Sequence, residues 1–189
     1  VRINGGEPLN FLFDTGNAGR SLIDVSVAQK LHFDLVPSGG ISFAGIKLPT
    51  LRLNAASCEI ASGEADRKGT EQWRQLKDVS CDVLDLTAFS ELTGRRVDGI
   101  LGADVIRRFV TTADYQKQTV SFSKPVSDTQ RAPSPTPTAS LSAKGNRIVM
   151  PFTLRDGWII VKTRIVGDGW SNEGSEEEMI LDTGAAPTT

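Results

Sequence analysis

The chain has 189 residues, enough for one sizeable domain, or for one complete lobe together with part of another. Its apolar share of 39% and charged share of 23% are ordinary for a globular protein, and a net charge of -2 provides no basic field for nucleic acid. No apolar run reaches the ~18 residues of a membrane-spanning helix, so none is predicted.

Short apolar segments separated by turn residues predict a mostly β structure for residues 1–122. The apolar residues from Leu9 to Phe13 predict a buried strand that ends at Asp14. Asp24 is suited to cap a short helix from Val25 to about Leu31. The polar stretch 61–78 is expected to be an exposed excursion with one helical turn. Further strands are expected at 41–43, 48–53, 79–84 and 97–101, short helices at 85–94 and 103–109, and a hairpin over 110–122.

The composition changes after this region. Residues 123–146 include alternating prolines between Ala132 and Thr138, which predicts an extended, weakly ordered linker. Strands are then expected at 148–154 and 158–166. A polar loop follows, and a last strand, Met179 to Leu181, meets Asp182.

Two parts of the sequence match each other. Residues 12–18 align with 180–186, and residues 1–5 align with 163–167, with six more residues in the second intervening loop. We therefore expect a first lobe over 1–122 that lacks its N-terminal strand, a linker over 123–146, and the start of a second similar lobe over 147–189. On this interpretation the chain is truncated at both ends.

Each copy carries the triplet Asp-Thr-Gly after an apolar strand, at Asp14 and at Asp182. Two carboxylates held in contact share one proton, because like charges so close do not both ionise easily. The ionised partner is then a general base for water, and the protonated partner polarises a carbonyl group. The pattern predicts a catalytic pair. The alternative is that both triplets are only tight turns at strand ends.

The neighbours of each carboxylate have predicted supporting roles. Thr15 and Thr183 are expected to hydrogen-bond across to the opposite loop and fix the separation of the two carboxylates. Gly16 and Gly184 allow the backbone to turn sharply and bring its amides close to the carboxylates.

The sequence FLFDTGNAGRSLIDVSVAQKL, from Phe11 to Leu31, resembles the active-site loop and short helix of bacterial retropepsin-like aspartic proteases. The sequence from Val97 to Phe122 resembles the closing element of that family. The resemblance implies an acid-protease barrel lobe in which Ile100-Leu101-Gly102 passes beneath the active-site loop. It also implies a flap near Ser38 to Leu48 and a periplasmic or secreted protein.

The chain departs from the family pattern after Asp-Thr-Gly. The family often has a small residue and then Ser or Thr, whereas this chain has Asn17-Ala18 and Ala185-Ala186. Both copies therefore lack a hydroxyl that would support a carboxylate oxygen. We consider Asn17 as a substitute hydrogen-bond donor.

The leading hypothesis is an aspartic endopeptidase with a polypeptide substrate, in which Asp14 pairs with Asp182 and no cofactor takes part. The partner of the first lobe is either the second lobe of the same chain or a homodimer partner that supplies another Asp14. A non-catalytic peptide-binding module is the remaining alternative. Two aspartates and one distant His32 do not make a metal site.

Two further expectations concern the chain as a whole. We expect it to be inactive as a monomer, because Asp182 has no Ile-Leu-Gly-like support of its own. Cys58 and Cys81 are predicted to be two free, partly buried thiols, with a single disulfide as the alternative.

Overall fold

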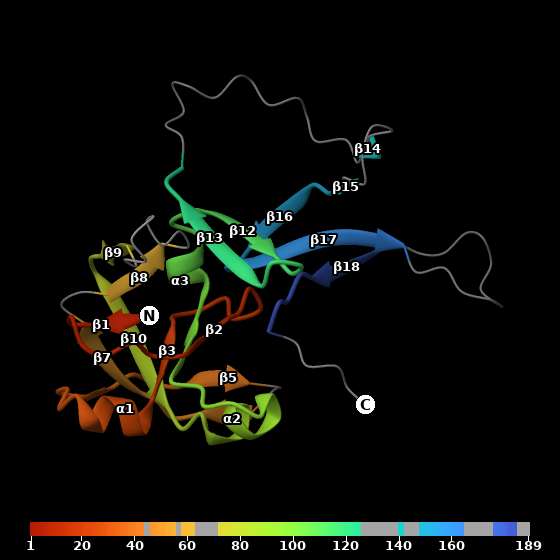
Figure 1. The fold of residues 1–189 in the computed structure, drawn as a ribbon. Helices are drawn as coiled ribbons and strands as arrows, with labels where there is room; N and C mark the ends of the chain where they lie inside the picture. Colours follow the sequence, from red (N-terminus) through yellow and green to blue (C-terminus); the bar gives the residue numbers. More distant parts are fainter. Residues whose placement is uncertain are drawn as a thin grey trace.

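The computed structural model describes residues 1–43, 46–55, 58–62, 72–125, 140–141, 148–164 and 176–184. In these ranges the chain is mostly β with three short helices, as the sequence predicts (Figure 1). The helices are α1 (Val25–Lys30), α2 (Thr87–Thr93) and α3 (Ala103–Ile106). The strands up to the hairpin are β1 (Arg2–Ile3), β2 (Phe11–Phe13), β3 (Leu22–Asp24), β4 (Val36–Pro37), β5 (Ile41–Phe43), β6 (Ile46–Leu48), β7 (Leu51–Ala55), β8 (Cys58–Ser62), β9 (Gln72–Leu76), β10 (Val79–Leu84), β11 (Gly99–Leu101), β12 (Val110–Asp114) and β13 (Thr119–Ser123). The later strands are β14 (Ser140–Leu141), β15 (Ile148–Val149), β16 (Phe152–Arg155), β17 (Trp158–Arg164) and β18 (Glu176–Ile180).

A six-stranded mixed sheet, in the order β2-β11-β3-β10-β7-β4, organises residues 1–125. Strand β11 lies between β2 and β3, parallel to β2 and antiparallel to β3. Gly99 fits there because a Cβ atom at this position would lie 2.6 Å from the carbonyl oxygen of Leu22 and would overlap the ring of Phe11. The sheet thereby holds β11 directly beside the strand that leads to Asp14.

The start of α1 and the end of α2 follow local sequence chemistry. The side chain of Asp24 accepts hydrogen bonds from the backbone N–H groups of Ser26 and of Leu86, both at 2.9 Å. This one buried carboxylate therefore caps α1 and fixes the segment before α2. Helix α2 ends at Gly94, whose φ of 63° is the left-handed conformation typical of a glycine C-cap.

The main hydrophobic core joins the six-stranded sheet to a second sheet, β1-β8-β9. Val27 and Ala28 of α1 pack into it from one side. Cys58 of β8 and Cys81 of β10 are both free thiols buried in this core, so no disulfide joins them here. The core places a rigid layer behind the loop that carries Asp14.

Proline divides two of the strands expected from the sequence. The expected strand 48–53 is two strands, β6 and β7, with Pro49 between them. The expected strand 148–154 is likewise divided into β15 and β16 around Pro151. Proline has no N–H to donate to a ladder, so pairing stops at both positions.

Three other expectations need correction. Segment 61–78 is not simply an excursion, because β8 and β9 form an antiparallel pair in which Leu76 packs on the core; residues 63–71 lie outside the described ranges. The expected linker 123–146 contains β14, which pairs with β15. Its proline-containing part lies outside the described residues. Helix α3 ends at Ile106 rather than Phe109.

The C-terminal region forms the three-stranded antiparallel sheet β16-β17-β18. Thr163 of β17 pairs with Glu177 of β18. At the corresponding place near the N-terminus, Val1 and Leu9 exchange backbone hydrogen bonds of 2.9 and 2.7 Å. The alignment of residues 1–5 with 163–167 places Val1 at the position of Thr163. Counting back from the aligned segments 12–18 and 180–186 places Leu9 at the position of Glu177.

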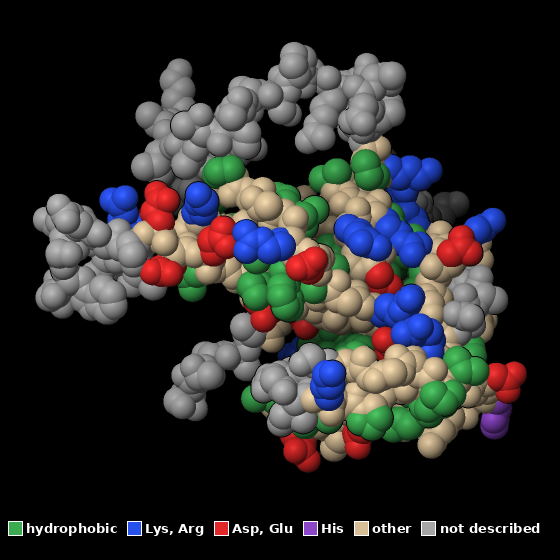
Figure 2. All heavy atoms as spheres, turned by 180° about the vertical axis from the view of Figure 1, so that it is seen from behind, with side chains coloured by type: hydrophobic (Ala, Val, Ile, Leu, Met, Phe, Trp, Pro, Cys, Tyr) green, Lys and Arg blue, Asp and Glu red, His purple; other side chains and the backbone are tan. Residues whose placement is uncertain are grey.

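The surface shown in Figure 2 carries acidic and basic side chains among polar and hydrophobic ones. Among the described residues, no helix has the length and apolar character needed to cross a bilayer.

Candidate functional site

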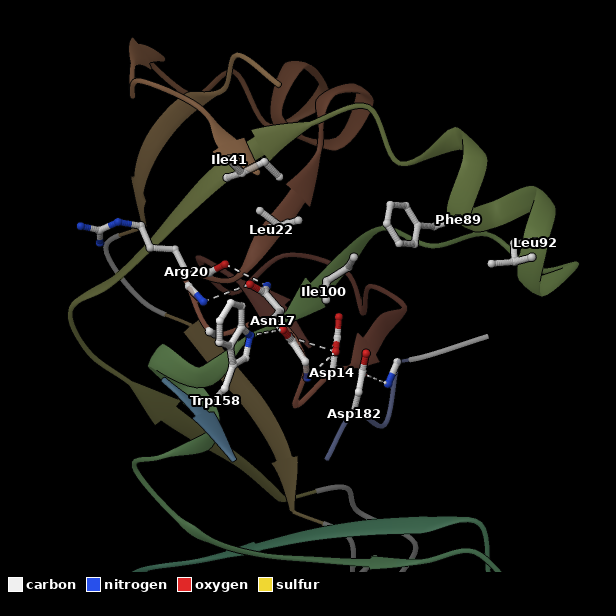
Figure 3. Close-up of a pocket in the computed structure, with 14 residues that line it drawn as sticks. Asp14, Asn17, Arg20, Leu22, Ile41, Phe89, Leu92, Ile100, Trp158 and Asp182 are labelled. Carbon is white, nitrogen blue, oxygen red and sulfur yellow. Dashed lines mark hydrogen bonds between the residues drawn. The ribbon is translucent and has the colours of Figure 1, made fainter. Parts of the chain in front are cut away.

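The two Asp-Thr-Gly loops, 168 positions apart, meet at one cavity. Asp14 follows β2, and Asp182 follows β18. Both carboxylates line a cavity of about 550 Å³ (Figure 3). The structure therefore brings together the two side chains that the sequence predicts to act as a pair. Other lining residues include Gly16, Asn17, Arg20, Leu22, Ile41, Phe89, Leu92, Ile100, Trp158 and Gly184.

Reciprocal threonine hydrogen bonds join the loops. Thr15 Oγ1 donates to the carbonyl oxygen of Leu181 at 2.7 Å, and Thr183 Oγ1 donates to that of Phe13 at 2.9 Å. Each hydroxyl oxygen also accepts from the backbone N–H of the opposite threonine, at 3.0 and 3.1 Å. Each loop is thus held by the other, in the arrangement expected for these threonines.

The two glycines leave room for the opposite carboxylate. A Cβ atom at Gly16 would lie 2.5 Å from both carboxylate oxygens of Asp182. One at Gly184 would lie 2.5 Å from Cγ of Asp14. These separations are shorter than real Cβ contacts allow, so close approach of the carboxylates requires glycine at both positions.

Backbone amides solvate the carboxylates. Asp14 Oδ1 accepts from the N–H groups of Gly16 at 2.8 Å and Asn17 at 3.1 Å. Asp182 Oδ1 accepts from Gly184 at 2.7 Å. Burial raises the pKa of Asp14 above its ordinary value, and a hydrogen bond to Asp182 and the charge of Asp182 raise it further. A proton on the pair is therefore favoured.

The expected support beneath the first loop is present. Strand β11 contains Ile100 and Leu101, and the N–H of Asp14 donates to the carbonyl oxygen of Leu101 at 3.2 Å. After Gly102, the N–H of Ala103 donates to the carbonyl oxygen of Asn17 at 2.9 Å. Both ends of the loop segment 14–17 are therefore tied to one rigid strand and the turn that follows it.

The expectation for the Asn17 side chain is wrong in this structure. Its Nδ2 donates to the carbonyl oxygen of Arg20 at 3.0 Å, and its Oδ1 accepts from the N–H of Gly19 at 3.2 Å. The side chain shapes its own loop and leaves donation to Asp14 to the backbone. Ala185, the corresponding predicted position, lies outside the described residues.

Ser21 and Asp104 form a support that the sequence analysis missed. Ser21 is 1% exposed, and its N–H and hydroxyl donate to Asp104 Oδ1 at 2.9 and 2.8 Å. The same hydroxyl oxygen accepts from the N–H of Gly102 at 3.0 Å. These bonds fix the end of the active-site loop to the start of α3. The sequence signal for this support would have been Ser21 itself, a polar residue next to the motif at a position expected to be buried.

Trp158, for which no role in the site was expected from the sequence, also contacts the site. Its Nε1 donates to the carbonyl oxygen of Gly16 at 2.9 Å. Gly157 beside it packs so closely on the carbonyl of Ala18 that a Cβ atom there would overlap it. The β16-β17 hairpin thus contacts the first loop and forms one cavity wall (Figure 3). A tryptophan after an Asp-Gly turn was the available signal.

The expected flap region overlaps β5 and β6, a separate two-stranded sheet. Ile41 of β5 lines the cavity, which is compatible with a covering role; Ala44 and Gly45 at its tip lie outside the described residues. Its role as a flap stays a prediction.

The arrangement suits acid–base chemistry on a bound substrate. Two carboxylates face one cavity, one proton is favoured between them, and apolar walls surround them. Within the described ranges, no three His, Cys, Asp or Glu side chains gather in a way that could hold a metal ion.

The comparisons with known proteins agree with this geometry. The family model described as aspartyl protease matches residues 1–105, which is more than half of the 189 residues. The match includes the first Asp-Thr-Gly and the supporting strand β11, and it ends before the second triplet. No curated protein and no solved structure matches the chain significantly.

Proposed function

Because the chain belongs to the aspartyl protease family, we propose that it is an endopeptidase in which Asp14 and Asp182 activate a water for peptide-bond hydrolysis. The observation that carries this proposal is the reciprocal fit of the loops. Each threonine bonds to the opposite loop, and each glycine leaves room for the opposite carboxylate.

The chemistry follows from one proton on the pair. One carboxyl group of the pair holds it, and the ionised partner accepts a proton from water as the water oxygen attacks the carbonyl carbon. The first carboxyl group gives its proton to the carbonyl oxygen, which yields a tetrahedral diol. The partner then gives the proton taken from water to the amide nitrogen, the C–N bond breaks, and a hydroxyl proton of the diol returns to the first carboxyl group, so the pair again holds one proton.

A dyad within one chain is favoured over a homodimer that pairs two copies of Asp14. The cross-loop hydrogen bonds join residues of the same chain, and both carboxylates line the same cavity. These bonds also hold the Asp182 loop in place. The expectation of an inactive monomer rested on the lack of an Ile-Leu-Gly-like support for Asp182, and the cross-loop bonds are a support of another kind.

The test compares cleavage of a denatured protein substrate by wild type, Asp14→Asn and Asp182→Asn. Light scattering measures the molecular mass of each protease sample, which distinguishes a monomer from a dimer. Both variants should lose at least about a thousandfold in kcat/KM, because each lacks one partner of the dyad. An Asp182→Asn variant with full activity would overturn the intramolecular dyad. If both variants are inactive, mixing them tests exchange between chains, since cleavage would return only where Asp14 of one chain meets Asp182 of another.

A non-catalytic peptide-binding module is the second candidate, favoured by one observation. The Asn17 side chain bonds within its own loop, so among the described residues no side-chain hydroxyl or amide next to either triplet donates to a carboxylate. Tight binding of a pepstatin-type transition-state mimic, without cleavage of any peptide in a mixed library, would support this candidate against the endopeptidase.

A further inference from the structure

The walls of the cavity divide into two kinds of surface. The side chains around Asp14 and Asp182 are largely apolar and come from β3, β5, α2, β11 and β17. They are Leu22, Ile41, Phe89, Leu92, Ile100 and Trp158. Among the described residues, one cationic side chain, that of Arg20, lines the same cavity. A substrate that fills it therefore meets apolar surface, the dyad and one positive charge.

The backbone of Arg20 is held in place, whereas its guanidinium group forms no ion pair among the described residues. Its carbonyl oxygen accepts from Asn17 Nδ2, and the next residue, Ser21, is buried and bonded to Asp104. Its side chain is exposed, and no ion pair joins it to a carboxylate in the described part of the chain. In Figure 3 this side chain extends away from Asp14 and Asp182. The backbone is fixed while the guanidinium remains available to a ligand.

We infer that Arg20 is a specificity residue that selects substrates with an acidic side chain displaced from the scissile bond, next to a large apolar residue. This inference rests on the proposed function. The guanidinium group forms paired hydrogen bonds with a carboxylate, which a neutral side chain does not offer. The apolar walls accept the large residue, because burying its surface removes it from water.

The negative charge of the two aspartates adds to the substrate preference set by Arg20. With one proton shared, Asp14 and Asp182 carry one negative charge, which repels an acidic side chain placed beside the scissile bond. Arg20, whose side chain extends away from both aspartates (Figure 3), attracts an acidic side chain that lies farther from the scissile bond. The two fields together favour one register of the peptide. The acidic preference should therefore appear at one substrate position and weaken as salt is added.

The experiment is a charge reversal with peptide libraries randomised on both sides of the cleavage point. Wild type should cleave peptides with Asp or Glu at one position about two- to fivefold faster in kcat/KM than matched Asn or Gln peptides, the size typical of a solvated ion pair. Arg20→Glu should reverse the preference toward Lys or Arg at that same position. Arg95→Glu, an equal charge change at an exposed residue outside the cavity lining, should keep the wild-type preference.

A second measurement separates this inference from the proposed function. Asp14→Asn keeps Arg20 and removes turnover, so labelled peptides that differ only in Glu or Gln report binding alone by fluorescence anisotropy. Tighter binding of the Glu peptide, lost in Asp14→Asn/Arg20→Glu, supports the inference even where wild type cleaves nothing. Equal binding of both peptides, or an acidic preference that survives Arg20→Glu, overturns it and leaves the endopeptidase proposal standing.

Discussion

The carboxyl group of Asp14 has two kinds of neighbour with opposing effects. Burial and Asp182 raise its pKa, whereas the N–H groups of Gly16 and Asn17 lower it. The raising influences dominate, so the folded chain binds this proton more tightly than the unfolded chain does. Ionisation of Asp14 in the folded state therefore costs stability, and the cost begins as pH rises above the ordinary pKa of an aspartate.

Replacing Asp14 by Asn removes this titration, so the direction in which the stability difference changes with pH can be predicted. The free energy of unfolding of Asp14→Asn minus that of wild type should increase as pH rises from 3 toward 7, and level off above the folded-state pKa of Asp14. Urea denaturation at pH 3, 5 and 7 measures the difference. Asp34→Asn, an exposed carboxyl outside the cavity lining, is the control. A difference that shrinks with pH would contradict the assignment.

At the scale of the element, the two active-site loops contain a pair of threonines that form hydrogen bonds and a pair of glycines at which a side chain would not fit. Thr15 and Thr183 supply the cross-loop bonds, and Gly16 and Gly184 supply the space. A loop whose polar groups are paired in this way is rigid without any extended ladder. This rigidity allows two like charges to be held together despite their repulsion.

A glycine comparison within this loop tests the requirement for space. Gly16→Ala places a Cβ atom 2.5 Å from the carboxylate oxygens of Asp182, so either this carboxyl group turns away from Asp14 or the loops separate. We expect a loss of about 1–3 kcal/mol in stability and of at least about a hundredfold in kcat/KM. Gly19→Ala is the matched control, because its Cβ atom would meet only Asn17 Oδ1, at 3.6 Å. Thermal unfolding and peptide cleavage report both quantities, and equal effects at the two glycines would refute the steric account.

Local signals predicted several elements well. Asp24 and Gly94 mark helix ends with side-chain and backbone chemistry that acts within a few residues, and both helices lie there. The errors at Pro49 and Pro151 arose because apolar runs were read as continuous strands, although proline ends a ladder. Strand β9 was missed because its polar residues Arg74 and Gln75 are exposed to solvent, although Leu76 packs on the core.

At the scale of the whole molecule, the repeat was the informative signal for the site. Two copies of one motif predicted that residues 168 positions apart would meet, because a carboxylate pair requires both. The repeat does not specify the contacts made by the residues between the two copies. Trp158 reaches Gly16 only because the β16-β17 hairpin packs on the first loop, and no local pattern encodes that contact. Likewise, a role for Arg20 in substrate selection is inferred only because the structure places it in the cavity lining.

The two buried cysteines offer a test of how the whole N-terminal region unfolds. Cys58 lies in the three-stranded sheet and Cys81 in the six-stranded one, yet both belong to one core. Burial raises the pKa of Cys58 to about 11 and of Cys81 to about 12. At pH 8 almost no thiolate forms in the folded chain, and the thiolate is the form that reacts. Modification should therefore require opening of the core.

We expect an alkylating reagent at pH 8 to label both cysteines over the same range of urea concentration in which circular dichroism reports loss of structure. Peptide mapping by mass spectrometry separates the two sites without any substitution. Because a shared core couples the two sheets, their labelling midpoints should coincide. Earlier labelling of Cys58 would show that the sheet β1-β8-β9 opens by itself, and the scaffold behind Asp14 would then be the six-stranded sheet alone. Rapid labelling without urea would contradict the burial of both thiols.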